Sequence, residues 1–220
     1  MTLNRAERKA LTRQKILDAA MQLLVSGRGL DSLGLREVAR EAELAAPSLY
    51  NHFPDMDSLG QALVDQACFR LRNAMRQGRR ELIVADPAGG VRDLVDRFLA
   101  YLAGNEAEFR LLVQQRLGTS ASIRRRVHRE LQLLVEELAD DVRSVGEHRN
   151  LPPVDDLRAA EAAVAVMFGY GILALDMTPA QRRAGRDRVV VQLSMVFLGA
   201  RALLGGARLG DVLTVQKENP

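Results

Sequence analysis

The sequence is poor in cysteine, in aromatic residues and in long hydrophobic runs. Its 220 residues include no tryptophan and one cysteine, Cys68, so an internal disulfide is impossible and a disulfide-stapled secreted scaffold is excluded. The longest apolar run, residues 162–175, has 14 residues, which is too short to span a bilayer. The charged N-terminus has no apolar segment behind it, so no secretory signal is predicted. We therefore expect a cytoplasmic protein without membrane contact.

Residues that carry catalytic or metal chemistry are also scarce. The three histidines, His52, His128 and His148, are scattered, and none has metal-ligand spacing to another histidine or to Cys68. No phosphate-binding glycine loop and no nucleophile elbow is present. The sequence therefore predicts a protein that is not an enzyme and that has no metal site and no cofactor.

The positive charge is concentrated at the N-terminus. The formal net charge is +3, whereas residues 1–16 alone carry a net +4, so the rest of the chain carries −1. Only Glu7 opposes the cations of this segment, which are Arg5, Arg8, Lys9, Arg13 and Lys15. A basic arm on an almost neutral body is typical of a protein that contacts a polyanion, and a solvated tail is the alternative.

The apolar spacing is helical almost throughout, and no segment alternates as a half-buried strand does. We predict an all-α fold of about nine helices, four before residue 80 and five after it. The predicted parts are a DNA-binding domain at 1–56, a connecting helix at 57–80, a ligand-binding and dimerisation domain at 81–207 and a tail at 208–220. Expected cap residues include Asp86 before Pro87, and Asn105 with Glu108 in a capping box.

Residues 35–53 predict a helix-turn-helix. Two short helices, at about 35–42 and 46–52, are joined by a three-residue turn and cannot be stable alone. We expect them to pack on a first helix at about 8–26 through the apolar side chains of Val38, Ala39, Leu44, Leu49 and Phe53. The opposite face of the second helix is small and polar, as in a helix that enters the DNA major groove.

Three segments resemble the N-terminal signature of TetR-family transcriptional repressors: residues 12–20 (TRQKILDAA), 35–39 (LREVA) and 48–53 (SLYNHF). The resemblance implies that Ser48, Tyr50 and His52 hold DNA phosphates, with further backbone contacts from Thr12, Arg13 and Arg36. It also implies that bases are read by Ala46 and Pro47, through thymine methyl groups, and by Asn51, through adenine. Lys9 of the basic arm completes the expected DNA-binding set.

The sequence departs from this family's pattern at three positions. Glu43 stands where the turn usually has glycine, and a left-handed backbone there would cost about 1 kcal/mol. Ala45 replaces the usual serine or threonine cap of the second helix. Met56 replaces a lysine that often contacts a phosphate. These departures predict weaker DNA affinity but the same fold.

Further segments of the chain resemble the subgroup of this family represented by the FabR and DesT repressors of unsaturated fatty-acid synthesis. They include residues 109–112, Arg116, 118–121, 129–130 and 137–139. The resemblance implies a long-chain acyl-CoA effector in an apolar cavity. Expected lining residues are Phe98, Tyr101, Leu102, Phe109, Leu112, Arg116, Leu134, Leu138, Phe168 and Ile172. Two arginine groups, 72/76/79/80 and 124–126, could bind the phosphates of the effector, although a solvated face is the default interpretation of each.

The last two helices predict a homodimer. Residues 159–175 are rich in alanine and glycine, and the last helix is apolar over a wide arc, as a buried helix–helix seam requires. The sequence thus predicts a ligand-responsive repressor that binds a twofold-symmetric DNA operator. Two alternatives stay open: a TetR-type regulator of an efflux or catabolic operon that responds to a hydrophobic drug or metabolite, and a helical lipid carrier without DNA binding.

Overall fold

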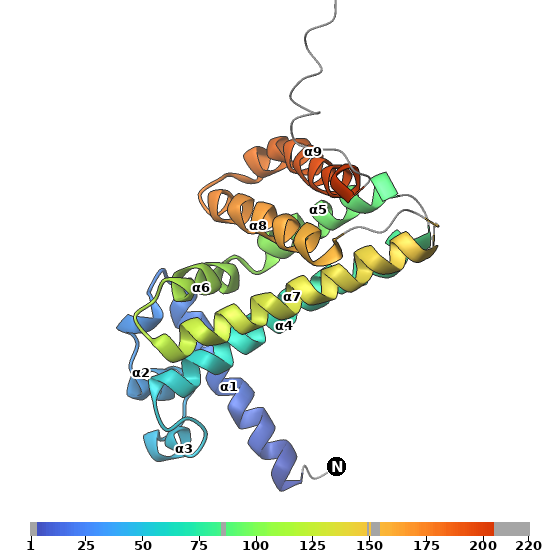
Figure 1. Cartoon of the computed structure of the whole chain (residues 1–220). Coiled ribbons are helices and arrows are strands. Elements are labelled where there is room, and N and C mark those ends of the chain that lie inside the picture. The colour runs from blue at the N-terminus through green and yellow to red at the C-terminus, as the bar shows by residue number, and fades with distance from the viewer. Residues whose placement is uncertain (1–3, 85–86, 149, 151–154, 205–220) are drawn as a thin grey trace, which may run out of the picture. The chain divides into compact units, whose positions relative to one another are not determined.

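A computed structural model describes residues 4–84, 87–148, 150 and 155–204. In these ranges it has nine α-helices, one short 3-10 helix and no strand, which confirms the all-α prediction (Figure 1). Asp86 and the tail at 208–220 lie outside the described residues. The elements are α1 (Arg5–Val25), η1 (Leu30–Ser32), α2 (Leu35–Glu41), α3 (Ala46–Tyr50), α4 (Met56–Val84), α5 (Pro87–Gly104), α6 (Glu106–Arg116), α7 (Ala121–His148), α8 (Asp156–Ala174) and α9 (Pro179–Leu204).

The chain packs into two compact units. Unit 1 comprises residues 1–71 and 105–131, and unit 2 comprises residues 72–104 and 132–220. Both α4 and α7 continue from one unit into the other, whereas α6 lies wholly in unit 1. The boundaries predicted at residues 56 and 80 concern function rather than packing and stay a prediction.

The core of unit 1 joins α1, α2 and α3 through the expected apolar side chains. Val38, Ala39, Leu49 and Phe53 are all buried, and α1 packs on α2 with its own buried stripe at 16, 17, 19, 20 and 24. Leu44, the fifth apolar residue expected in this core, is only half-buried. It directly follows the residue that reverses the chain, which leaves its side chain at the edge of the core.

The two asparagine–glutamate pairs at helix starts behave differently. At α1 the Asn4 side chain accepts from the Glu7 N–H at 2.9 Å and the Glu7 carboxylate accepts from the Asn4 N–H at 2.7 Å, a complete capping box. The capping box predicted at Asn105 and Glu108 is wrong, since the Asn105 side chain makes no cap hydrogen bond. Glu108 is buried instead and contacts Arg70 of α4.

Within unit 1 the first halves of α4 and α7 are tied by polar and close apolar contacts. The Asp57 carboxylate accepts hydrogen bonds from Ser120, at 2.7 Å, and from Ser122. The Arg126 guanidinium makes a two-pronged ion pair with Asp65. At Gly60 an added Cβ would lie 2.6 Å from Ile123 Cδ1, so the Ile123 side chain packs directly on the Gly60 backbone.

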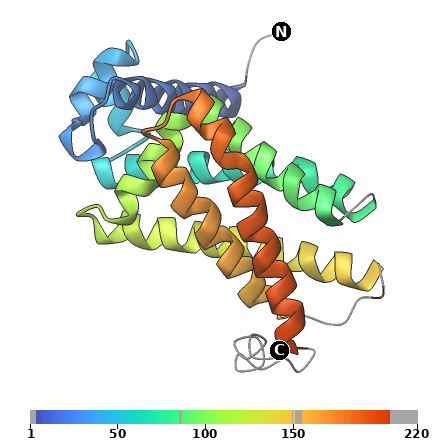
Figure 2. The same cartoon turned by 90° about the horizontal axis from the view of Figure 1, so that it is seen from above.

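Unit 2 contains the pair α8 and α9, which lie side by side and pack on α5 (Figure 2). The Tyr170 hydroxyl of α8 donates to the Arg182 carbonyl of α9 at 2.8 Å, and its ring lies over Gly185. Arg186 of α9 pairs with Asp96 of α5. By length and hydropathy alone, α8 could cross a membrane, but a core helix of a globular protein passes the same test, and the buried face of α8 packs on α9.

Candidate DNA-binding site

The turn between α2 and α3 contains a left-handed residue. Glu43 has φ +51°, as its place at a glycine position predicts. The Leu44 N–H donates to the Ala39 carbonyl at 2.8 Å and the Glu43 N–H donates to the Arg40 carbonyl at 3.0 Å, which is the Schellman pattern. The Glu43 carboxylate also pairs with Lys15 of α1 at 3.2 Å. The turn thus has glycine-type geometry without glycine.

The predicted base-facing residues lie on the outward side of α3. Pro47, Tyr50 and Asn51 are exposed, Ala46 and Ser48 are half-buried, and Leu49 points into the core. Ala45 makes no side-chain cap, as expected from its sequence. The helix ends at Tyr50 rather than near residue 52, so Asn51 is its C-cap and His52 lies in the following turn. The outward surface therefore combines one short helix with the turn behind it.

The N-terminal half of α1 brings cations to the end of α3. The Arg13 guanidinium lies 5.1 Å from the centre of the Phe53 ring, which is a cation–π contact. Partial burial of the imidazole and the nearby charges of Lys9 and Arg13 lower the pKa of His52. Lys9, Arg13 and His52, although about 40 residues apart in the sequence, therefore form one cluster, which we call the α1–α3 junction.

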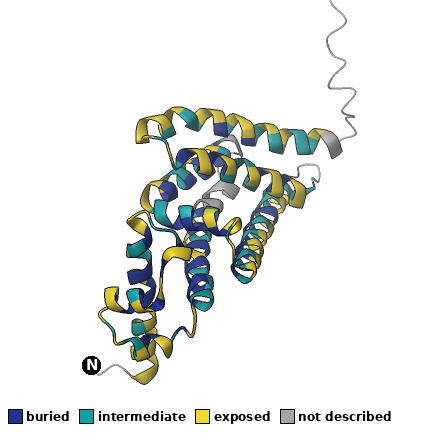
Figure 3. Cartoon of the chain, turned by 90° about the vertical axis from the view of Figure 1, so that its left-hand side faces the viewer, coloured by how far each residue is buried: buried dark blue, intermediate teal, exposed yellow. Residues whose placement is uncertain are grey.

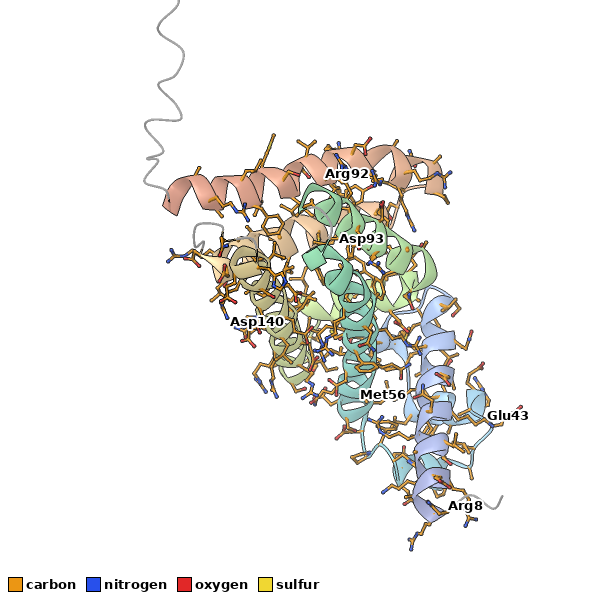
Figure 4. The ribbon with its side chains drawn as sticks, turned by 90° about the vertical axis from the view of Figure 1, so that its right-hand side faces the viewer. Arg8, Glu43, Met56, Arg92, Asp93 and Asp140 are labelled. Atoms are coloured by element: carbon orange, nitrogen blue, oxygen red, sulfur yellow. The ribbon has the colours of Figure 1, made fainter. Side chains whose placement is uncertain are left out.

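The remaining predicted contacts lie around this junction. Arg36 is exposed in the first turn of α2, and the half-buried Thr12 donates its hydroxyl to the Arg8 carbonyl at 2.9 Å. Met56 is half-buried at the start of α4. The basic arm is not a loose tail in the described residues, because Arg5 and Arg8 belong to the capped first turns of α1. Arg8 and Glu43 project from their elements in Figure 4.

Two cationic residues, Arg5 and Arg8, stand out only in the structure as candidates for DNA contact. The sequence analysis includes both residues in the basic N-terminal arm but not among the predicted DNA contacts, because no secondary structure was expected for the start of the arm. Asn4, followed three residues later by Glu7, is the signal that could have placed them on a helix.

The predicted effector-binding residues are divided between the two units. Phe109 and Leu112 are buried in unit 1, where Arg116 is exposed. In unit 2, Phe168 is half-buried and Ile172 is exposed, and the buried members are Phe98, Tyr101, Leu102, Leu134 and Leu138. A shared cavity lined by these residues stays a prediction.

The two arginine groups are largely paired with protein groups where the structure describes them. Arg72 and Arg76 both contact Glu137, at 3.6 and 2.6 Å. Arg124 donates to the Gly118 and Thr119 carbonyls, and Arg126 pairs with Asp65. The side chains of residues 79 and 80 lie outside the described residues. Most of the described arginines of these groups therefore already have hydrogen-bond or ion-pair partners within their own unit.

Two buried polar groups on α6 have an atom without a hydrogen-bond partner. They are Oε2 of Glu108 and Oε1 of Gln115, one on each side of Leu111 and Leu112. Burial raises the pKa of Glu108 against the opposing effect of Arg70, which contacts Oε1 at 2.5 Å. In the part of the chain that the structure describes, no group of three or more His, Cys, Asp or Glu residues is placed to hold a metal ion.

Comparison with known proteins agrees with this geometry. Residues 16–63 match the model of the bacterial regulatory proteins of the tetR family. A TetR-family transcriptional regulator from Mesorhizobium loti has 18% sequence identity and a TM-score of 0.73, over 87% of this chain and 98% of that one. A TetR-family member from Streptomyces coelicolor has 25% identity and a TM-score of 0.64, over 83% of this chain and 97% of that one.

A third similar structure is FadR from Bacillus subtilis, a transcriptional regulator in complex with stearoyl-CoA. It has 14% identity and a TM-score of 0.64, over 84% of this chain and 98% of that one. Such low identity indicates a shared fold alone. The match to the family model identifies residues 16–63 as a segment of the tetR-family type, and the solved structures show that the fold is shared over most of the chain.

Proposed function

We propose that this protein is a transcriptional repressor that binds a twofold-symmetric DNA operator as a homodimer and changes its operator affinity when it binds a hydrophobic effector. The observation that carries the proposal is the α1–α3 junction, where three groups able to bind phosphate border the exposed face of a recognition helix. That arrangement matches the phosphate-positioning and base-reading halves of a helix-turn-helix interface.

The contacts divide into two kinds. Ser48, Tyr50, Arg36 and Thr12 hold backbone phosphates, together with the α1–α3 junction, and these contacts carry no sequence information. Asn51 pairs with adenine, and the apolar surfaces of Ala46 and Pro47 meet thymine methyl groups. The exposure of Pro47, Tyr50 and Asn51 supports this division.

A gel shift against DNA from the region upstream of the protein's own gene tests the proposal. We expect a sequence-specific complex that weakens as salt rises. Asn51→Ala should lower only the specific affinity, by about 1–3 kcal/mol, because it removes a base contact. Tyr50→Phe should weaken specific and non-specific binding alike. Arg110→Ala, which removes a cation paired with Glu106 on α6, is the control for charge. Absence of any specific complex would refute the proposal.

The dimer is proposed to form through α8 and α9. Large apolar side chains are exposed on both helices, and Figure 3 shows α9 exposed along much of its length. They include Ile172 and Leu173 on α8 and Val191, Met195 and Leu198 on α9. The exposed face of α8 also carries Ala162, Ala165 and Gly169, which allow a second copy of the same pair to approach closely. A twofold four-helix seam would bury all of these residues.

Sedimentation tests the seam. Met195 and Leu198 are 65% and 66% exposed in the single chain, so burial of their side chains should be large in a dimer. We expect Met195→Asp with Leu198→Asp to give a monomer. The matched control is Leu117→Asp, an 85% exposed leucine of unit 1 that should leave the dimer intact. A dimer of unchanged affinity in the double variant would exclude this seam.

We further propose that the effector is a long-chain acyl-CoA and that the regulated genes serve unsaturated fatty-acid synthesis. The support is the buried apolar set on α5, α6 and α7 and the fold shared with a regulator that binds stearoyl-CoA. Mass spectrometry of ligand that copurifies with the protein tests this choice. An acyl-CoA supports it, whereas a drug-like or other metabolite indicates a regulator of an efflux or catabolic operon.

A further inference from the structure

The net positive charge of the chain belongs to unit 1, but the helix-turn-helix segment of this unit does not supply it. Residues 1–71 contain nine basic and nine acidic residues, so this segment is neutral in total. Residues 105–131 contain six arginines and three glutamates, a net charge of +3, which equals the net charge of the whole chain. The unit that contains the helix-turn-helix is therefore positive because of α6 and the start of α7.

The six arginines lie in one stretch that has no acidic residue. Residues 109–129 contain all of them and no aspartate or glutamate. On a solvated helix face, arginine is stabilised by an acid one turn away, as Arg110 is by Glu106 at 3.2 Å. The arginines that follow Arg110 have no acid of their own stretch to pair with, so any partner has to come from another part of the molecule.

Two of these arginines find their partners inside unit 1. Arg124 donates to the carbonyls of Gly118 and Thr119 at 2.6 and 2.7 Å, which holds the turn before α7. Arg126 donates to the Asp65 carboxylate of α4 at 2.8 Å. Both side chains thus stabilise the packing of α7 and are not available to another molecule.

The other three arginines have no partner. Arg116, at the end of α6, and Arg125 and Arg129, on α7, are exposed and make no hydrogen bond or ion pair in the part of the chain that the structure describes. Arg125 and Arg129 lie one turn apart on the same face of α7, with about 6 Å between their Cβ atoms. We call these three residues the α6–α7 basic surface.

Contacts within unit 1 place the start of α7 beside the start of α4. Ser120 and Ser122, on either side of the first residue of α7, donate to the Asp57 carboxylate in the first turn of α4. Ile123 packs on Gly60 one turn further along (Figure 1). Asp57 comes seven residues after the end of α3, a length of chain that spans at most about 25 Å. The α6–α7 basic surface therefore belongs to the same packed unit as the recognition helix and begins close to it.

Separate cations without neighbouring acids fit a polyanion better than a single small anion. A DNA duplex has one phosphate charge per about 1.7 Å of its axis, so each cation can neutralise a phosphate of its own. We propose that Arg116, Arg125 and Arg129 bind backbone phosphates of DNA beside the segment that the helix-turn-helix reads. The inference rests on the proposed DNA-binding function and adds a contact surface outside the helix-turn-helix. Such contacts raise the affinity for DNA of any sequence and add no specificity.

The test is DNA affinity measured by fluorescence anisotropy at several salt concentrations, on duplexes that extend about one helical turn past the operator on each side. A cation that neutralises one phosphate contributes about 0.9 to the slope of log affinity against log salt concentration. Arg125→Gln with Arg129→Gln should therefore reduce this slope by about 2 per protomer, on operator and unrelated DNA alike. Arg125→Lys with Arg129→Lys keeps both charges and should keep most of the slope.

The matched control is Arg92→Gln with Arg143→Gln, which removes two charges from exposed arginines of unit 2. Its net charge equals that of the glutamine double variant on α7, and we expect the wild-type slope. Arg116→Gln keeps the test valid if the double variant on α7 folds poorly. This single change on α6 should reduce the slope by about 1 per protomer.

The outcomes separate the two proposals. If the wild-type protein forms no sequence-specific complex, the proposed function fails. If it binds the operator specifically but the slope is unchanged in the α7 and α6 glutamine variants, or falls equally in the unit 2 control, the α6–α7 basic surface does not bind DNA and only the present inference fails. An unchanged slope together with weaker binding of acyl-CoA would assign the surface to the phosphates of the effector instead, which also overturns the inference.

Discussion

Replacing Glu43 by glycine should stabilise the protein, because Glu43 occupies a backbone conformation that a Cβ atom disfavours. Its φ of +51° closes the turn between α2 and α3 through two backbone hydrogen bonds to α2. A residue with a side chain loses about 1–2 kcal/mol in this left-handed region relative to glycine. Glycine in turn loses about 0.5–1 kcal/mol more backbone freedom on folding, which offsets part of the gain.

The Lys15–Glu43 ion pair decides how much of this gain remains. The pair spans 3.2 Å, but the Lys15 and Glu43 side chains are 49% and 83% exposed. Solvent screening limits such a pair to a few tenths of a kcal/mol in typical cases. We therefore expect Glu43→Gly to raise the free energy of unfolding by about 0.5 kcal/mol and the Tm by roughly 1–2 °C for a chain of this size.

Glu43→Gly and Glu43→Ala both lack the carboxylate, so the difference between their free energies of unfolding does not depend on the Lys15–Glu43 ion pair. We expect glycine to exceed alanine by about 1 kcal/mol, and Glu43→Asn to lie between them because asparagine tolerates the left-handed region. Urea unfolding followed by circular dichroism, at one fixed protein concentration, gives the ranking. If alanine is as stable as glycine, residue 43 is not left-handed in solution and the reasoning is wrong.

Three further predictions concern other sites. Gly185→Ala should destabilise the protein by about 1–3 kcal/mol in urea unfolding, because its Cβ would lie 2.5 Å from the Tyr170 hydroxyl, whereas Gly146→Ala, with nothing within 4 Å, should be neutral or stabilising. Glu108→Gln should raise the Tm at about pH 7.5, because burial raises the pKa of Glu108 and so disfavours its charged form. Because the pKa of Glu108 is higher in the folded than in the unfolded chain, protonation of Glu108 stabilises the folded state at low pH, and this stabilisation is lost as pH rises. The Tm advantage of glutamine should therefore shrink toward about pH 4.5. A Tm advantage that does not change with pH would contradict the prediction. Monomer formation by Met195→Asp with Leu198→Asp, checked by sedimentation, tests the α8–α9 seam.

Local signals in the sequence predicted most of the helix-turn-helix. Val38, Ala39, Leu49 and Phe53 repeat at helical spacing and are buried, and the glycine position predicted the left-handed turn at Glu43. These features depend on residues close together in the chain. Leu44 shows the limit of this reasoning, because an apolar residue in a turn can lie at the edge of the core.

The two asparagine–glutamate pairs show why the rest could not be predicted. At Asn4 the local pattern forms a capping box, whereas at Asn105 the same pattern does not, because Glu108 is buried against Arg70, 38 positions earlier in the chain. The α1–α3 junction and the ties between α4 and α7 are likewise contacts between distant positions. The spacing of apolar residues along one segment does not show which side chain from a distant part of the chain will bind a polar group such as the Glu108 carboxylate.

The discontinuity of unit 1 has a consequence for anyone who builds hybrid regulators. A graft that takes residues 1–71 alone would leave Asp65 without Arg126, Asp57 without its two serines, and the bare surface at Gly60 in water. A DNA-binding module that is moved to another protein has to include residues 105–131 as well. The fusion junctions then lie inside α4 and α7, which both continue from one unit into the other. Splices that keep α4 and α7 in register should give working chimeras, whereas a cut after the recognition helix should give insoluble ones.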